Sequence, residues 1–340
     1  MNRRELLLGS AAFAGAMLFG RAQAAQAKPS QAAYISHAHC LKHNMGAQHP
    51  EQPARLLAIE SALENAGLLN QMQRFDAPKA SKMQLARVHT PTYIDHIFKV
   101  SPKMGLNDSL VLLDADTAMN PDSLEATLRA SGAAVLAVDL VMQNKSKQVF
   151  CNTRPPGHHA GRANAAGFCI FNNVAVATAH AMAHYGVQRV AIIDFDVHHG
   201  DGTEDIFHDD ARVMLCSSFR HPYYPHKGAD SGNEHMLNAP LAAGSDGNAL
   251  REVFNQQWLP ALTKFKPQLI IFSAGFDAHA EDKMGGLTWL DEDYAWITQQ
   301  VKMIANQFSQ GRMVSVLEGG YALDALGRSA VAHVKAMIDI

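Results

Sequence analysis

Short apolar runs alternate with longer stretches of helical periodicity from about residue 32 to the C-terminus. Several runs are apolar throughout, as is typical of parallel strands that are buried on both faces. The expected strands are 32–36, 149–152, 190–196, 213–217, 269–274 and 313–317. The expected helices, supported by Ala/Leu periodicity and by Asn, Asp or Pro starts, are 53–66, 121–143, 172–185, 248–265 and 291–307. The alternation predicts an α/β fold with an open, doubly wound, mainly parallel sheet, in a single domain over residues 28–340.

Titratable residues follow four of the expected strands at the same end. His158 and His159 come after 149–152, and the segment 194–201 contains three aspartates and two histidines. Asp277 follows 269–274, and Tyr321 follows 313–317. Because ligands of open α/β sheets bind beyond the carboxyl ends of the strands, these side chains are expected to form one site.

The first 27 residues have the layout of a removable export signal. Arg3 and Arg4 precede a weakly apolar stretch, and small residues alternate up to Ala27. The arginine pair resembles a twin-arginine signal, although Asn2 precedes it and no lysine follows the leucines. We expect a signal peptide over 1–27 and a periplasmic or secreted mature protein, with an amphipathic N-terminal helix as the alternative. Removal of three arginines and one glutamate would change the formal charge from −3 to −5.

The composition excludes several classes of protein. Charged residues make up 18% of the 340 residues and apolar residues 47%, so a sizeable core is expected and extended disorder is not. A formal charge of −3 without a basic run argues against nucleic acid as a partner. No later segment approaches 18 consecutive apolar residues, so no stable membrane span is expected after removal of the leader. Four scattered cysteines make no disulfide framework, whereas 18 histidines direct attention to metal or proton chemistry.

Asp196, His198 and Asp277 have the residue types of a catalytic metal site. Asp196 and His198 are two positions apart, which places both side chains on one side of a strand or of its extended exit. Asp277 would add a third ligand from another strand end. One imidazole and two carboxylates leave a coordination position open, as a catalytic metal requires. This ligand set suits Zn²⁺ but also Fe²⁺ or Co²⁺.

The tandem histidines His158 and His159 are candidates for proton transfer. The Pro-Pro-Gly turn before them can aim both rings into one pocket, and each ring would need a carboxylate to orient it. Asp194 and Asp201 are available for this task. Tyr321 follows two glycines, so its phenol can point inward and donate to an oxyanion near a metal. Packing would explain any one of these residues alone, but their grouping at strand ends favours catalysis.

Five sequence blocks resemble the signature of the zinc-dependent histone deacetylase superfamily, with residues 49–55 matching a further N-terminal block. The resemblance covers about residue 37 to the C-terminus and implies a deacetylase catalytic domain with the eight-stranded arginase/deacetylase fold. A phenylalanine before Asp277 favours the bacterial class II-type amidohydrolases, which include the acetylpolyamine amidohydrolases. The five blocks are Pro155-Pro156-Gly157-His158-His159, Gly167-Phe168-Cys169, the segment 194–203, Ala274-Gly275-Phe276-Asp277 and Glu318-Gly319-Gly320-Tyr321.

The resemblance implies zinc-assisted hydrolysis of an amide, with one Zn²⁺ on the three metal-ligand candidates. His159 would be the general base that activates water, and Asp201 would support it. His158, supported by Asp194, would be an electrostatic partner or the acid that protonates the leaving amine. Tyr321 would donate to the developing oxyanion.

The same resemblance implies the substrate contacts. Phe168, with Gly167 before it, and one of Tyr223 or Tyr224, with Tyr224 as first choice, would wall the tunnel for an acyl-lysine. Asp116 stands roughly where the family grips the substrate backbone.

The resemblance also bears on metals other than the catalytic zinc. The related arginases place an Asp two residues after the strand-end histidine to hold a second metal. Gly200 stands there in this chain, which indicates one catalytic metal and argues against guanidine hydrolysis. Arg55 would lie in an internal cavity behind the zinc. The resemblance also implies two structural K⁺ sites. The first would use Asp194, Asp196, the His198 carbonyl, Ser217 and the Ser218 carbonyl. The second would lie at the Phe207 carbonyl.

The family divides between acyl-lysine substrates and acetylated polyamines. One polyamine branch has a Glu seven residues after the third zinc ligand, and Met284 occupies that position here. Glu281, Asp282 and Asp116 remain alternative sources of negative charge at the pocket mouth. We therefore expect a deacetylase of small or peptide acyl-lysine-like amines, with an acetylpolyamine deacetylase as the alternative and a metal-holding module without turnover as the less favoured one. The resemblance is compatible with a homo-oligomer as well as with a monomer.

Four histidines and a cysteine gather in the loop after the first expected strand: His37, His39, Cys40, His43 and His49. A second zinc site is one interpretation of this group, and a loop that shapes the pocket rim is the preferred one. The other three cysteines lie in or beside apolar runs and are expected to be buried thiols without disulfides.

Overall fold

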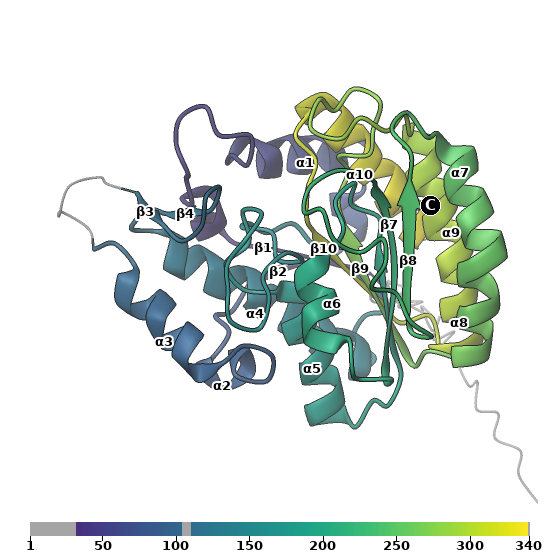
Figure 1. Ribbon diagram of the computed structural model, residues 1–340, viewed down its shortest axis with the longest axis horizontal. Coiled ribbons are helices and arrows are strands. Elements are labelled where there is room, and N and C mark those ends of the chain that lie inside the picture. Colours follow the sequence, from purple (N-terminus) through teal and green to yellow (C-terminus); the bar gives the residue numbers. More distant parts are fainter. Residues whose placement is uncertain (1–31, 104–109, 339–340) are drawn as a thin grey trace, which may run out of the picture.

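An eight-stranded parallel sheet forms the centre of the computed structural model, which describes residues 32–103 and 110–338 (Figure 1). The strand order is β2-β1-β5-β10-β9-β6-β7-β8, and each neighbouring pair is parallel. The predicted doubly wound parallel sheet is therefore confirmed. The strands are β1 (Ala32–Ser36), β2 (Gln73–Asp76), β5 (Gln148–Cys151), β6 (Val190–Asp194), β7 (Val213–Arg220), β8 (Met236–Leu241), β9 (Leu269–Ala274) and β10 (Met313–Leu317), with a separate antiparallel ribbon of β3 (Val111–Leu112) and β4 (Ala118–Met119).

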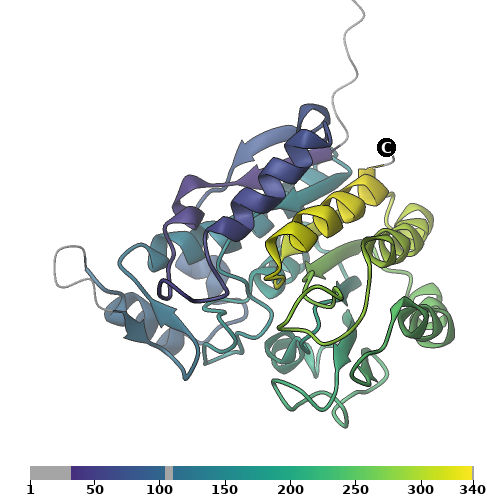
Figure 2. The same cartoon turned by 90° about the horizontal axis from the view of Figure 1, so that it is seen from above.

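Helices cover both faces of the sheet. The helices α1, α9 and α10 lie on one face with α7 and α8, and α4 and α5 lie on the other. Figure 2 shows α1 and α10 side by side. The helices are α1 (Ala54–Asn65), α2 (Lys82–Leu85), α3 (Pro91–Val100), α4 (Ser123–Met142), α5 (Asn173–Tyr185), α6 (Asp201–Phe207), α7 (Gly247–Val253), α8 (Leu259–Phe265), α9 (Asp291–Phe308) and α10 (Leu323–Ile338), with short turns η1 (Ala38–Leu41), η2 (Leu69–Gln71) and η3 (Phe254–Trp258).

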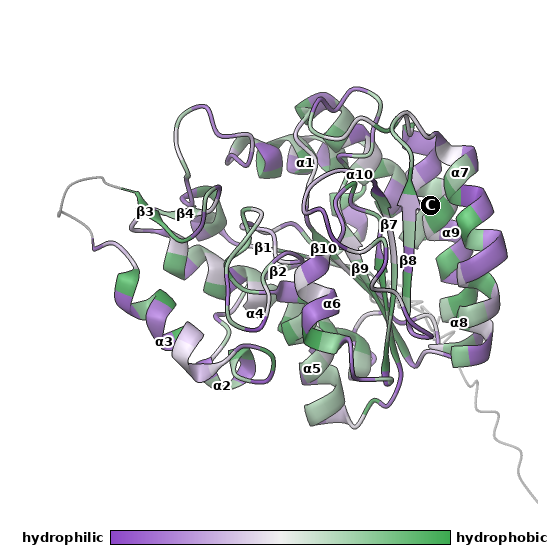
Figure 3. Cartoon of the chain, in the orientation of Figure 1, coloured by the Kyte–Doolittle hydropathy of each residue, from purple (hydrophilic) through white to green (hydrophobic). Residues whose placement is uncertain are grey.

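The central strands are mostly apolar and are buried along their whole length, because both of their faces are covered (Figure 3). Alternate side chains of one strand enter opposite cores. On β5, Val149 and Cys151 pack with α4 and α5, whereas Phe150 packs with α1 and α10. This two-sided burial holds the strand ends rigidly, and the loops that follow them carry the candidate site.

Several elements of the fold were not anticipated from the sequence. β2 is an edge strand with mostly exposed polar side chains, and β8, the other edge, contains Pro240, which an edge strand tolerates. The short helices α2 and α3, α6, and the C-terminal α10 were also unanticipated. The expected helix 248–265 forms, but the π-helical turn η3 interrupts it before Pro260, whose ring and missing N–H disturb a regular helix.

The predicted leader over residues 1–27 lies outside the described residues. Within the described part of the chain, no helix is long and apolar enough to cross a membrane. All four cysteines are buried and free. Burial was expected for Cys151, Cys169 and Cys216, whereas that of Cys40 was not.

Candidate active site and metal centre

The candidate site lies at the carboxyl ends of β5, β10, β9 and β6, four strands that are adjacent in the sheet. The loop after β5 carries His158 and His159, and the loop after β6 carries Asp196 and His198. The exits of β9 and β10 add the remaining residues of the predicted cluster. Segments that are more than a hundred residues apart in sequence thus meet at one edge of the sheet, as predicted.

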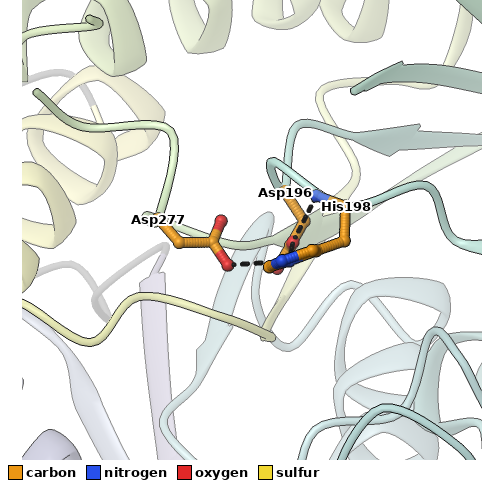
Figure 4. A group of neighbouring side chains, drawn as sticks. All are labelled: Asp196, His198 and Asp277. Carbon is orange, nitrogen blue, oxygen red and sulfur yellow. Dashed lines mark hydrogen bonds and ion pairs between the residues drawn. The ribbon is translucent and has the colours of Figure 1, made fainter. Parts of the chain in front are cut away.

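Asp196, His198 and Asp277 form a ready set of metal ligands (Figure 4). One ligand atom from each lies within 4.8 Å of the other two, and all three residues are buried. His198 Nδ1 lies 3.0 Å from Asp196 Oδ1 and 3.3 Å from Asp277 Oδ2. Apart from this ionic contact, Asp277 Oδ2 is buried without a hydrogen-bond partner in the described residues. Buried acceptors without a donor fit a cation, so these residues suit Zn²⁺ or a similar ion.

Glycines allow the two strand exits to approach the carboxylates closely. A Cβ on Gly275 would lie 2.0 Å from Asp196 Oδ2, and a Cβ on Gly319 would lie 2.1 Å from Asp277 Oδ2. The Gly319 amide instead donates to Asp196 Oδ2 at 2.8 Å. Any side chain at these two positions would therefore displace the carboxylates of the candidate metal ligands.

Two histidine–aspartate pairs stand beside the metal ligands. His158 Nδ1 lies 3.0 Å from Asp194 Oδ2, and His159 Nδ1 lies 2.8 Å from Asp201 Oδ1. The two imidazole centroids are 4.1 Å apart. Because the Nδ1 of His159 faces a carboxylate, its Nε2 remains available to a water molecule or a substrate. The Nε2 of His158 lies 3.8 Å from Asp196 Oδ2. The other oxygen of Asp201 pairs with Lys227 Nζ at 2.8 Å, a contact that no sequence pattern signalled.

The two histidines are driven toward opposite protonation states. Burial alone would lower the pKa of His158, but Asp194 and Asp196 outweigh it and raise the pKa well above 6.5. Burial and the neighbouring His158 lower the pKa of His159 to about 4, against the effect of Asp201. A pair of groups whose pKa values are pushed apart is suited to general acid and general base roles.

Tyr321 is held between an aromatic ring and a guanidinium group. Its ring meets Phe168 edge-on with centroids 6.1 Å apart, and the Arg55 guanidinium carbon lies 4.9 Å from its centroid. Burial raises the pKa of the Tyr321 phenol well above 10, so the phenol remains a proton donor. Arg55 is buried behind this loop, and its Nε donates to the Gly320 carbonyl at 2.6 Å.

A cavity of about 200 Å³ opens onto the two histidines and His198. A Cβ on Gly167, which has a φ of +54°, would lie 2.2 Å from the His159 ring, so only glycine fits there. Asp116 Oδ1 accepts from the Gly167 amide at 3.2 Å. Tyr223 and Tyr224, the two candidates for the tunnel wall, both line this cavity. Its lining residues are Asp116, Pro156, His158, His159, Gly167, Phe168, His198, Tyr223, Tyr224, Met284, Gly319 and Tyr321.

Comparison with known proteins identifies the family. A family model described as the histone deacetylase domain matches residues 49–337. The chain belongs to the histone deacetylase family. This family member is 35% identical to the histone deacetylase-like amidohydrolase of Pseudomonas aeruginosa, over 81% of this chain and 73% of the relative. It is 36% identical to the polyamine deacetylase HDAC10 of Mus musculus, over 85% of this chain and 45% of that protein. The solved HD domain of HDA15 superposes with a TM-score of 0.85 at 33% identity, covering 92% of this chain and 89% of that domain.

Of the three carboxylates expected near the pocket mouth of this histone deacetylase family member, only that of Asp116 lies in the cavity wall. Asp116 and Met284 line the cavity, whereas Glu281 and Asp282 do not. Glu281 pairs with Arg328 at 2.6 Å, and Asp282 is only 4% exposed. The carboxylate of Asp282 is bound by main-chain amides and does not face the cavity.

Glu318 is a residue near the site to which sequence reasoning gave no role. Its buried carboxylate accepts from the amides of Gly157 and His158 at 2.6 and 3.1 Å. Burial raises its pKa to about 7. Its position next to the Gly-Gly-Tyr turn was the one available signal.

The histidine-rich loop does not form a second ready metal site. Among the described residues, Asp196, His198 and Asp277 are the one group of three or more side chains close enough together to hold a metal ion. His49 packs edge-on against Phe168 with centroids 4.6 Å apart, so the loop contributes to the pocket rim.

The residues predicted to bind potassium lie on neighbouring elements. Asp194 and Ser217 are register partners on β6 and β7, Ser218 follows on β7, and Phe207 ends α6.

Proposed function

We propose that this histone deacetylase family member is a zinc-dependent amidohydrolase that removes acetyl or other acyl groups from acyl-lysine-like amines. One observation carries the proposal: His158, His159, His198 and Tyr321 line one cavity, and behind them the buried carboxylates complete a triad suited to a cation and two histidine–aspartate pairs. A Lewis acid, a general base and an oxyanion donor are the components that metal-assisted hydrolysis of an amide uses.

Asp196, His198 and Asp277 would hold Zn²⁺ and leave part of its coordination open. A zinc ion bound there supplies a Lewis acid for the amide carbonyl and lowers the pKa of water. His159, neutral at pH 7 because its pKa is about 4, accepts the proton of the attacking water at Nε2. Asp201 holds the ring by its Nδ1 during this step.

The developing oxyanion of the substrate receives a hydrogen bond from Tyr321, whose raised pKa keeps the proton on the phenol. His158 is positively charged beside Asp194, so it stabilises the negative charge that builds up in the cavity. A protonated histidine then delivers a proton to the amine nitrogen as the carbon–nitrogen bond breaks. The products are the carboxylic acid and the free amine.

Acyl-lysine peptides are the preferred substrates and acetylpolyamines the second candidate. Met284 in the cavity wall favours the first class, because it offers no charge to a distant ammonium group. Asp116 in the same wall and the similarity to a polyamine deacetylase support the second. The test is kcat/KM of the zinc-loaded protein on an acetyl-lysine peptide and on acetylputrescine. A large excess on acetylputrescine would reverse the preference, and no turnover of any amide would leave a metal-holding module.

We further propose a structural K⁺ near Asp194 and Ser217, supported by the register of β6 and β7. A higher Tm in K⁺ than in Na⁺ at equal ionic strength would support it.

Export through the twin-arginine route is also proposed, on the sequence of the leader alone. Recovery of the mature protein in the cytosolic fraction would contradict export.

A further inference from the structure

The catalytic candidate Tyr321 lies in a loop, not in a helix or strand. The loop connects the end of β10 at Leu317 with the start of α10 at Leu323. Gly320 in this loop has a φ of +114°, which residues other than glycine rarely adopt. The position of the phenol therefore depends on what holds the main chain around it.

Asp282 holds the main chain at Tyr321 itself. Its Oδ2 accepts hydrogen bonds from the amides of Tyr321 and Ala322 at 2.6 and 3.0 Å. These amides precede α10, so the carboxylate also lies at the positive end of a 16-residue helix. Hydrogen bonds to a charged acceptor are about twice as strong as neutral ones. The contact is thus a strong local restraint on the loop.

The second oxygen of Asp282 restrains the pocket wall. Oδ1 accepts from the Met284 amide at 2.9 Å, and Met284 lines the cavity. Asp282 is 4% exposed, and its own amide donates to the His279 carbonyl at 2.9 Å. Its segment is tied to the chain near Trp289 by a hydrogen bond from the Ala280 amide at 2.8 Å. Asp282 is therefore a fixed support between the loops that follow β9 and β10.

We infer that Asp282 is a positioning residue for catalysis, which sets the phenol of Tyr321 through the main chain. The inference rests on the proposed function, since Tyr321 acts on an oxyanion there. An oxyanion donor is effective only when it is held in place before the reaction, so a loosened loop would lower kcat. A change confined to the Met284 wall would instead alter KM.

The test is a double-mutant cycle on the full-length, zinc-loaded protein with an acetyl-lysine peptide. Asp282→Asn retains the shape but cannot accept from all three amides. We expect it to lower kcat about 10-fold or more with KM within about 3-fold, and Tyr321→Phe to lower kcat about 10²–10³-fold. The double variant should be within about 3-fold of Tyr321→Phe alone, because the two residues act through one group. Independent, multiplied losses would overturn the inference.

Glu281→Gln is the matched control. It removes a carboxylate from the same segment, but one that is exposed and pairs with Arg328, and it should leave kcat within about 2-fold. Zinc content and Tm of every variant show whether it is folded. If Asp282→Asn does not fold, Asp282→Ser replaces it in the same cycle.

A second readout does not depend on activity. Hydrogen exchange of the peptide that spans Tyr321 and Ala322 should be about 10-fold faster in Asp282→Asn than in the wild type and unchanged in Glu281→Gln. Unchanged exchange in Asp282→Asn would overturn the inference. A wild-type protein without amidohydrolase activity would refute the proposed function, while the exchange measurement would still decide whether Asp282 holds the loop.

Discussion

Glu51 is the buried anion of a cluster behind the active site. Arg154 donates to both of its oxygens, and Arg55 Nη1 lies 3.1 Å from Oε1. His43 Nε2 lies 3.4 Å from Oε2, and all four side chains are buried. The substitution Glu51→Gln would leave two guanidinium groups inside the protein without a carboxylate. We expect this single change to destabilise the fold strongly.

Two independent estimates of the contribution of Glu51 to the free energy of unfolding are similar. Removal of one partner from a buried ion pair costs about 3–5 kcal/mol. Burial alone would raise the pKa of Glu51, but Arg154, His43 and Arg55 outweigh it and lower the pKa from 4.5 to about 2. At about 1.36 kcal/mol per pKa unit, the difference contributes about 3 kcal/mol to the free energy of unfolding at pH 7. Because the folded pKa is the lower one, this contribution is complete above pH 4.5 and is lost as the pH falls toward 2.

Urea unfolding of the wild type and Glu51→Gln at pH 7 and pH 3.5 measures both effects. The variant should be less stable by about 3–5 kcal/mol at pH 7, and the difference should shrink by about 1 kcal/mol at pH 3.5. Glu60→Gln is the control, because Glu60 forms an exposed pair with Arg74 that contributes less than about 1 kcal/mol. A loss at pH 7 no larger than that of the control, or a difference that does not shrink in acid, would refute the reasoning.

Three further predictions concern the metal, the base and a buried histidine. Chelation should abolish amide hydrolysis and lower Tm, and added Zn²⁺ should restore both; retention of full activity in the metal-free protein would contradict this. His159→Ala should lower kcat about 10²–10⁴-fold with zinc content unchanged, as measured by steady-state kinetics and metal analysis. Burial lowers the pKa of His333 to about 3, so its neutral form stabilises the fold above pH 6.5 and this stabilisation is lost as the pH falls. Between pH 8 and pH 5 the wild type should lose about 2 kcal/mol more than His333→Gln in urea unfolding, and equal losses would refute this.

The strands that are buried on both faces of the sheet are the part of the fold that the sequence predicts best. β6, β9 and β10 are covered on both faces, and their continuous apolar runs indicate this directly. The polar residues immediately after these strands then follow from the rule that carboxyl ends of parallel strands meet. The grouping of the candidate metal triad with the two histidines could be anticipated in this way, whereas the pairing of each histidine with its own aspartate was implied by the resemblance to the deacetylase superfamily.

Other features depend on tertiary contacts that leave no local pattern. Glu281 and Asp282 are adjacent acidic residues, yet one is exposed beside Arg328 and the other is buried under three amides. Only the fold of the loop separates them. Lys227 likewise reaches Asp201 from a segment without regular structure, and β2 becomes a strand because β1 offers it an edge.

The strand order has a consequence for how the site is assembled. β10 lies between β5 and β9, although it is the last strand to be synthesised. Without it, the sheet would consist of two separate halves. One half would carry His158 and His159, and the other would carry the three metal ligands. Pairing of β10 with β5 and β9 therefore joins the two histidines to the candidate metal ligands. In the proposed enzyme, a nascent chain without β10 would present those ligands before it could catalyse hydrolysis.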